Sequence, residues 1–251
     1  MLIDTHCHLD ASEFDSDRSE VIGRARSAGV GAFVIPAVER SGFSKVLEIC
    51  GNELACHPAL GIHPMYVENA VPEDLEILRE RAMEVVAIGE IGLDFFVENY
   101  DRERQIYFFE AQLKIAREFD LPVLLHVRRS QDTVLASLRR IRVKGGIAHA
   151  FNGSLQQAEE FIRLGFRLGF GGAMTFERAT RIRSLAETLP MASIVLETDS
   201  PDMPPSFIGK ARNSPEYLPK IAEVLANLRK MTANEVAMTT TENAREVLEL
   251  E

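Results

Sequence analysis

The strongest constraint on the fold of this chain is a regular alternation between short apolar runs and longer amphipathic stretches. Some runs, such as 32–38, are apolar throughout, which is typical of parallel strands buried on both faces. The stretches between them have a helical period: residues 101–120 place Ile106, Phe109 and Leu113 on one face. The pattern predicts eight strand–helix units, with strands at residues 2–6, 32–38, 55–62, 85–91, 122–127, 146–150, 167–171 and 193–197.

Eight such units in about 250 residues is the usual size of a (β/α)₈ TIM-like barrel, an α/β fold. The alternative, a doubly wound open sheet, would place a G-x-G-x-x-G motif after the first strand, and the sequence has none there. The longest irregular stretch, 200–215, follows the eighth predicted strand, where a barrel carries a loop of its active face. We therefore predict one domain over residues 1–251, ending in an extra helix or helix pair from residue 232.

Composition limits the kinds of binding partner and the cell compartment that we expect for this protein. With 28 Lys and Arg against 38 Asp and Glu, the net charge is −10, which argues against a protein that coats long duplex DNA. Three cysteines form no disulfide framework, and we see neither a signal peptide nor a run of about 18 apolar residues. We expect a cytoplasmic protein with no membrane association, and nothing in the sequence indicates an obligate protein partner.

Residues able to bind metal ions end several of the predicted strands. In a barrel these ends surround one mouth, where active sites are built. His6 and His8 are two residues apart, which places both imidazoles on one side of a strand, about 6.5 Å apart. Each residue alone could be an ordinary buried polar group, but charged groups are rarely buried without a partner or a metal. Four imidazoles and two carboxylates suit two divalent metal ions. The six residues are His6, His8, Glu90, His126, His149 and Asp199.

Other polar residues near the expected mouth are candidates for substrate binding. His63 ends the third predicted strand, where it would bind substrate, orient a ligand or cap the strand. Arg128 follows His126 by two residues and is placed to meet an anionic substrate. Lys210 and Arg212, in the long loop after the eighth strand, are further candidates for the same role.

Six motifs follow one another along the chain: IDTHCHLD (3–10), GIHP (61–64), AIGEIGLDF (87–95), PVLLHVR (122–128), HAFNGS (149–154) and ETDSPDMP (197–204). By these motifs the chain resembles, over nearly its whole length, the TatD family of metal-dependent deoxyribonucleases in the amidohydrolase superfamily. Asp202 and Met203 stand where many members have Tyr-Leu, and in this the chain is similar to a subgroup with ETDAPDMP. The loop GKARNSPEYL is one residue longer than the common GKRNxPxYL pattern.

The resemblance implies a TIM-like barrel with a centre of two divalent metal ions. By that likeness, Glu90 bridges two sites, one surrounded also by His6, His8 and Asp199, and one completed by His126 and His149. It implies Mg²⁺-dependent exonuclease action on single-stranded 3′ ends of DNA, and on RNA in some members. Imidazole-rich ligation by itself would suit Zn²⁺ or Mn²⁺.

Three hypotheses of function follow. The first is a deoxyribonuclease that hydrolyses phosphodiester bonds with metal-activated water, in which Asp199 takes the proton and Glu90 holds the ions together. His63 and Arg128 would stabilise the charge of the phosphate. The second is a metal-dependent ester or amide hydrolase, such as an aminoacyl-tRNA deacylase, since a fold does not fix the substrate. The third, a non-catalytic scaffold, is disfavoured because structural metal sites are closed and rich in cysteine.

Overall fold

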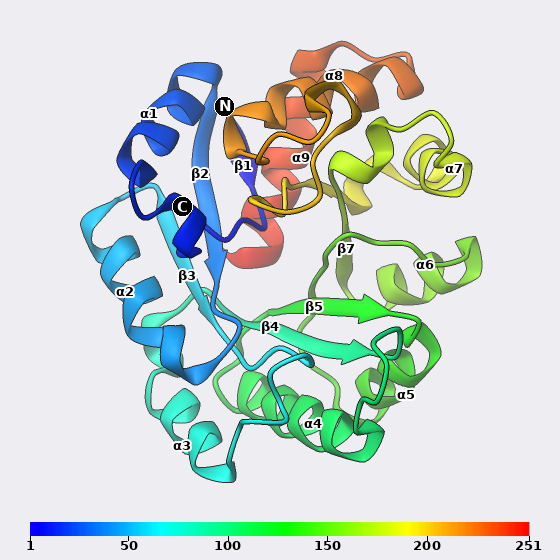
Figure 1. Cartoon of the computed structure of the whole chain (residues 1–251). Coiled ribbons are helices and arrows are strands. Elements are labelled where there is room, and N and C mark those ends of the chain that lie inside the picture. Colours follow the sequence, from blue (N-terminus) through cyan, green and yellow to red (C-terminus); the bar gives the residue numbers. More distant parts are fainter. Residues whose placement is uncertain (251) are drawn as a thin grey trace.

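The computed structural model describes residues 1–250, and its centre is one sheet of eight parallel strands (Figure 1). Each strand pairs with the next along the chain, so the sheet order is the sequence order. This is the (β/α)₈ barrel that the alternating pattern predicts. The strands are β1 (Leu2–Asp4), β2 (Val30–Pro36), β3 (Cys56–Leu60), β4 (Ala87–Asp94), β5 (Val123–Arg128), β6 (Gly146–Ala148), β7 (Phe166–Phe170) and β8 (Ile194–Leu196).

The two outer strands meet through the segments that follow them. The backbone N–H of Thr5 donates to the carbonyl of Leu196 at 3.1 Å, and the N–H of Asp199 donates to the carbonyl of His6 at 2.8 Å. These two bonds join the first and the last strand of the sheet and close the wall of the barrel at its mouth. They also fix the backbone on both sides of His6, because the residues next to it are tied to β8.

Helices surround the strands and begin and end where the sequence indicates. Ser154 caps α6: its Oγ accepts the N–H of Gln157 at 3.1 Å, which contributes about 1 kcal/mol. The turn after α6 passes through Gly165 at a φ of +88°, a conformation that glycine adopts without strain. The helices are α1 (Arg18–Ala28), α2 (Phe43–Asn52), α3 (Pro72–Glu80), α4 (Arg102–Glu118), α5 (Gln131–Ile141), α6 (Leu155–Arg163), α7 (Thr180–Thr188), α8 (Leu218–Arg229) and α9 (Ala233–Leu248).

The extra helix expected at the end of the chain is α9, which covers the end of the barrel opposite the mouth. Ala244 and Leu248 pack against buried apolar side chains that seven of the strands supply, and in Figure 1 the helix lies behind the strands. Asn243 donates to the carbonyls of Met191 and Ile194 and so ties the helix to the start of β8. Within residues 1–250, no helix combines the length and the apolar character needed to cross a membrane.

The strand ends differ from those predicted, and two of the metal-binding candidates are affected. Glu90 and His126 were expected to end their strands, but β4 continues to Asp94 and β5 to Arg128. The reason is an irregularity in the pairing of β4 with β5. At Gly92, φ is +151° and a Cβ atom would lie 1.9 Å from the carbonyl oxygen of His126, so only glycine lets the two strands continue side by side. The other four candidates lie in the residues that directly follow β1, β6 and β8.

Candidate functional site

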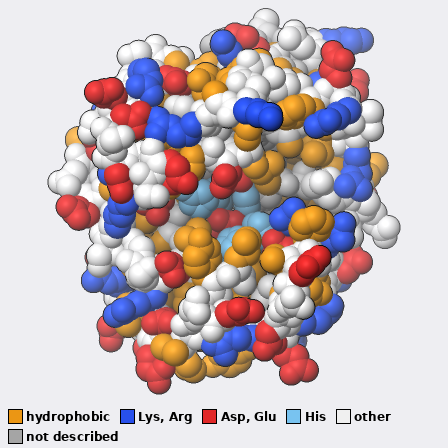
Figure 2. Space-filling model, viewed as in Figure 1, with side chains coloured by type: hydrophobic (Ala, Val, Ile, Leu, Met, Phe, Trp, Pro, Cys, Tyr) orange, Lys and Arg blue, Asp and Glu red, His pale blue; other side chains and the backbone are white. Residues whose placement is uncertain are grey.

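The mouth of the barrel holds a cleft of about 630 Å³ lined by histidines and carboxylates. Figure 2 shows the histidines at the bottom of a hollow in this face of the molecule. His6 lies beneath the cleft and is fully buried. The structure thus brings the six predicted metal-binding residues together, with His63 beside them: His6, His8, His63, Glu90, His126, His149 and Asp199.

Glu90 stands at the centre of this cluster, and its two oxygens face different groups of side chains. Oε2 lies 3.2 Å from Nε2 of His6 and 3.6 Å from Nε2 of His8. Oδ1 of Asp199 lies 3.8 Å from the same nitrogen of His6 and 3.6 Å from that of His8. These four residues offer nitrogen and oxygen atoms around one point, which is the arrangement a single divalent cation requires.

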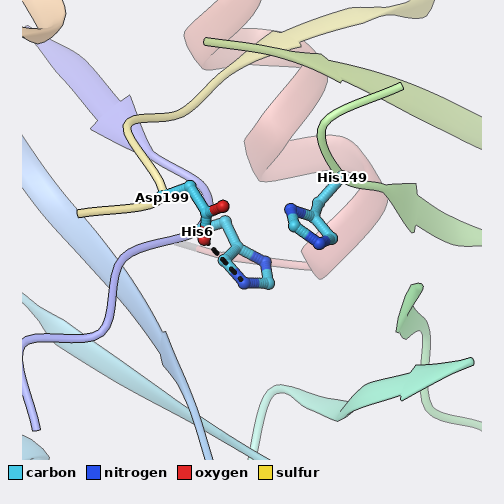
Figure 3. A group of neighbouring side chains, drawn as sticks. All are labelled: His6, His149 and Asp199. Atoms are coloured by element: carbon cyan, nitrogen blue, oxygen red, sulfur yellow. Dashed lines mark ion pairs between the residues drawn. The ribbon is translucent and has the colours of Figure 1, made fainter. Parts of the chain in front are cut away.

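The other oxygen of Glu90 faces a second group. Oε1 lies 2.8 Å from Nε2 of His149, 3.0 Å from Nδ1 of His126 and 3.4 Å from Nε2 of His63. His149 is shared between the groups, because its ring stacks on that of His6 with the centroids 4.0 Å apart. Figure 3 shows these two rings side by side, with Asp199 approaching His6. Glu90 is therefore placed to link two neighbouring sites.

The hydrogen bonding of the cluster fits bound cations better than it fits a closed polar core. Among residues 1–250, both ring nitrogens of His6 and Nδ1 of His149 are buried without a hydrogen-bond partner. Nε2 of His6 approaches Glu90 to 3.2 Å but without hydrogen-bonding geometry. Buried polar atoms are normally satisfied, so the unpaired Nε2 of His6, which lies beside two carboxylates, indicates a ligand atom. Three overlapping trios have ligand atoms within 4.8 Å of one another: His6, His149 and Asp199; His6, His8 and Glu90; and His63, Glu90 and His126.

The electrostatics of the cluster depend on Glu90. Burial raises the pKa of this carboxyl, but the imidazoles of His63, His149 and His6 outweigh burial and hold the pKa well below its usual range. Burial lowers the pKa of His149, yet Glu90 overcomes it and raises that pKa to about 10. Burial lowers the pKa of His6 to about 3, so this ring is neutral and able to bind a metal at neutral pH. Glu90 thus carries a negative charge among the imidazoles, and His149 would release its proton on binding a metal.

Sequence and structure comparisons place the chain in a family. Residues 3–249 match the family model described as TatD related DNase. The chain belongs to the TatD DNase family. The uncharacterized metal-dependent hydrolase YjjV of Escherichia coli K12 is 42% identical to it over 246 residues, covering 96% of this chain and 95% of that protein. The crystal structure of YjjV superposes with a TM-score of 0.96, covering 100% of this chain and 98% of that one, at 40% identity.

A second TatD relative carries a more specific name. The 3′-5′ ssDNA/RNA exonuclease TatD of Erwinia tasmaniensis is 34% identical over 260 residues, covering 99% of this chain and all of that protein. Similarity to proteins of this family and to metal-dependent hydrolases confirms the resemblance inferred from the six motifs. It favours the nuclease hypothesis over that of an aminoacyl-tRNA deacylase.

Asp94 is a functional candidate of this TatD protein that the sequence analysis missed. Its buried Oδ2 lies 3.2 Å from Nε2 of His126, while Nδ1 of the same ring faces Glu90. Burial raises the pKa of Asp94, but the contact with His126 and the N–H of Phe96 lower it more, so the carboxyl stays ionised. A carboxylate on the outer nitrogen fixes the proton there and leaves the inner nitrogen free for a metal. The only signal in the sequence was its position in the GLDF motif.

Glu197 and Asp4 are two more buried carboxyl groups that the sequence analysis did not single out. Oε1 of Glu197 lies 3.8 Å from Nδ1 of His149 and accepts the N–H of Ala150, which holds the segment after β6 in place. Burial raises the pKa of Glu197 to about 8 and that of Asp4 to about 7. Asp4 accepts the hydroxyl and the N–H of Thr198, next to Asp199 in the chain. Both groups support the backbone beneath the cluster.

The structure places the basic residues proposed for substrate contact in different surroundings. Arg128 is half exposed at the rim, with Nη1 3.8 Å from Oδ2 of Asp94. Arg212 pairs instead with Asp17 at 2.6 Å and bonds the carbonyl of Glu13, so it holds the loop against the segment that precedes α1. Lys210 is exposed on the same loop. Of these candidates, Arg128 is the cation that adjoins the histidine cluster.

Proposed function

We propose that this TatD protein is a divalent-metal-dependent deoxyribonuclease that removes nucleotides from the 3′ ends of single-stranded DNA, and of RNA as a second substrate. The observation that carries the proposal is Glu90, a buried carboxylate whose two oxygens face two groups of histidines. We propose two Mg²⁺ ions as the resident metals, with Mn²⁺ and Zn²⁺ as substitutes that the imidazole ligands would accept.

The ligand assignment follows the two faces of Glu90. His6, His8 and Asp199 would hold one ion, and His126 and His149 the other, with Glu90 between them. His63 and Arg128 would contact the phosphate of the substrate, since both lie at the edge of the second group. When bound, divalent ions supply a low-pKa water and neutralise phosphate charge.

The residues of the chain then have separate tasks. Asp199 takes the proton from the attacking water, because its carboxylate faces the cleft and is held by the backbone bond to His6. Glu90 remains ionised and keeps the two groups of histidines at a fixed separation. Arg128 neutralises charge that grows on the phosphate in the transition state. The outcome is in-line hydrolysis of one phosphodiester bond.

The same proposal extends to the organisation of the protein. We propose that residues 1–251 act as one catalytic domain in the cytoplasm. The closed wall of eight strands supports the first part, and the three free cysteines support the second, since they suit a reducing compartment.

The decisive experiment uses single-stranded DNA labelled at its 5′ end, incubated with the purified protein and Mg²⁺, Mn²⁺ or Zn²⁺ in turn. Stepwise shortening from the 3′ end, with release of mononucleotides, is expected. A matched reaction with DNA labelled at the 3′ end should release the label in the first step. Absence of cleavage with each metal would refute the proposal, and release of an acid from an aminoacylated RNA with the strand intact would replace it by the ester hydrolase.

A further inference from the structure

The rim of the mouth carries opposite charges on its two sides. The cleft above the histidines is lined on the β1, β2 and β8 side by Asp10, Glu13, Glu39 and Asp202. On the side of β5 to β7, the neighbouring surface carries arginines in place of carboxylates. Figure 2 shows Lys and Arg side chains beside the histidines toward α5 and α6, and Asp and Glu side chains toward α1 and α2. A polyanion is attracted to one side and repelled by the other.

The basic side contains a separate groove of about 560 Å³. It lies between the loops after β4, β5 and β6 and the start of α7. We call it the Phe96–Arg181 groove, and its principal side chains are Phe96, Arg128, Arg129, Asn152 and Arg181. No Asp or Glu lines it among the residues that the structure describes, although the whole chain has a net charge of −10. The local excess of positive charge is therefore a specific feature of this groove.

Two of its arginines have no carboxylate partner among residues 1–250. Within the described part of the chain, neither Arg129 nor Arg181 lies within ion-pairing distance of a carboxylate, and Arg181 bonds only the side-chain oxygen of Asn152, at 2.6 Å. By contrast, Arg139 and Arg163, at the far end of α5 and α6, both pair with Glu160 at 2.6 Å. Unpaired guanidinium groups around a hollow are suited to phosphate, which they bind through two parallel hydrogen bonds.

An exposed aromatic ring lies among these cations. Phe96 is 46% exposed. The guanidinium of Arg128 lies 3.8 Å from the centroid of its ring, and that of Arg129 lies 4.5 Å from it. The exposed part of the ring offers apolar surface for a base, and the two arginines beside it offer contacts for the neighbouring phosphates. This combination is typical of grooves that bind single-stranded nucleic acid.

The groove adjoins the histidine cluster through Arg128. Arg128 contacts Phe96 on one side and lies 3.8 Å from Asp94 on the other, and Asp94 contacts His126. A strand whose scissile phosphate sits over the cluster would therefore pass Arg128 to enter the groove. The acidic side of the cleft offers no comparable path for a chain of phosphates.

We propose that the Phe96–Arg181 groove binds the nucleotides next to the scissile bond, with a base on Phe96 and the phosphates on Arg129 and Arg181. This inference rests on the proposed nuclease function and adds the path and direction of the substrate strand. The acidic side of the cleft is left for the terminal nucleoside, which has no further phosphate beyond it.

The test measures binding separately from hydrolysis. Fluorescence anisotropy with labelled (dT)₁₀ and EDTA-treated protein gives the Kd of the strand over a range of salt concentrations. For Arg129→Ala/Arg181→Ala we expect a Kd about 10- to 100-fold higher and a salt dependence shallower by about 1.4, the value for two lost phosphate contacts. Phe96→Ala should raise the Kd by roughly tenfold through lost stacking. Arg129→Lys/Arg181→Lys should recover part of the binding.

The matched control removes the same charge from the other end of the barrel. Lys114→Ala/Arg117→Ala, near the end of α4, takes two exposed cations from a region far from the mouth, and its Kd should stay within twofold of that of the wild type. A groove double variant that binds (dT)₁₀ as tightly as this control would overturn the inference.

A small phosphodiester separates failure of the inference from failure of the proposed function. Bis(4-nitrophenyl) phosphate has a single phosphate, so it has no second phosphate for Arg129 or Arg181 to bind. Turnover of this ester by the wild type, with a strand Kd unchanged by the groove substitutions, would retain the nuclease and refute the groove. If the wild type neither hydrolyses the ester nor binds the strand, both proposals fall together.

Discussion

The mouth of the barrel has a floor, the buried cluster around Glu90, and a rim, the exposed side chains that include Arg128 and Phe96. The two regions are built in different ways. On the floor, the side chain of Glu90 is 3% exposed; one of its oxygens faces two histidines that follow β1, and the other faces histidines from β5 and from the segments after β3 and β6. At the rim, the side chain of Arg128 is 51% exposed and stacks on Phe96, in the loop that follows β4. Buried groups fixed by several strands are suited to hold ions and protons in place, and exposed side chains on loops are suited to grip a substrate. Substitutions in the two regions should therefore change different kinetic constants.

The largest effect is expected at the centre of the floor. Glu90→Gln replaces a charged side chain by a neutral amide, so the five imidazoles that face Glu90 lose its negative charge, and the two proposed cations would lose their shared ligand. We expect metal content to fall, most strongly at the group of His126 and His149, and activity to fall to background. Elemental analysis after dialysis against metal measures the number of ions bound per chain. Glu160→Gln, which makes the same substitution on the outer surface, is the matched control. Metal content equal to that of the wild type would show that Glu90 does not bridge.

A smaller effect is expected at the edge of the floor. Asp199→Asn keeps the shape and one oxygen of the side chain but removes the basic group. We expect the variant to fold, to retain at least one metal ion per chain, and to lose about 10²–10⁴-fold in kcat. Initial rates with saturating DNA, together with circular dichroism, measure this. Turnover near that of the wild type would mean that another group takes the proton.

A weaker effect is expected at Asp94, which contacts the nitrogen of His126 that faces away from Glu90. Asp94→Asn keeps an acceptor for the N–H of Phe96 but removes the charge that fixes the proton on His126. We expect metal affinity to fall by about 10–100-fold, with activity restored at high metal concentration. Titration of activity with metal distinguishes this from Asp199→Asn, which excess metal should not rescue. A loss that excess metal leaves unchanged would place Asp94 in the chemical step.

The smallest effect is expected at the rim. Arg128→Ala removes a phosphate contact and leaves the floor intact, so we expect kcat/KM to fall by about 10–100-fold, mainly through a higher KM, with metal content unchanged. Steady-state kinetics with a short oligonucleotide separate the two constants. A fall in kcat at constant KM would show that Arg128 acts in the chemical step, as the residues of the floor are expected to do.

The sequence was most informative where function follows from position along a strand. Parallel strands with apolar middles predict a barrel, and the carboxyl ends of such strands must meet, which is why His6, Glu90 and His149 could be grouped although they are far apart in the chain. The motif resemblance supplied the pairing into two sites. Both steps need only residue type and order.

The sequence could not show which side chains from different strands and loops come into contact in the folded barrel. Asp94 and His126 lie on adjacent strands and meet only because β4 continues past an irregular pairing, and no spacing rule reports such a meeting. Arg212 looked equal to Arg128 as a phosphate ligand until the fold of the last loop placed it against Asp17. The Phe96–Arg181 groove likewise combines three loops, each of which looks ordinary alone.

The two hydrogen bonds that join the residues after β1 to β8 and to the segment that follows it connect the beginning of the chain to a part that is synthesised much later. A ribosome makes His6 and His8 first and reaches Asp199 roughly 190 residues later, which at about 5–20 residues per second takes on the order of 10–40 s. During that interval the histidines have no wall to close against and no carboxylate from the last strand. We therefore expect a growing chain to be inert toward the nucleic acid around it. Activity begins only when synthesis has passed the last strand.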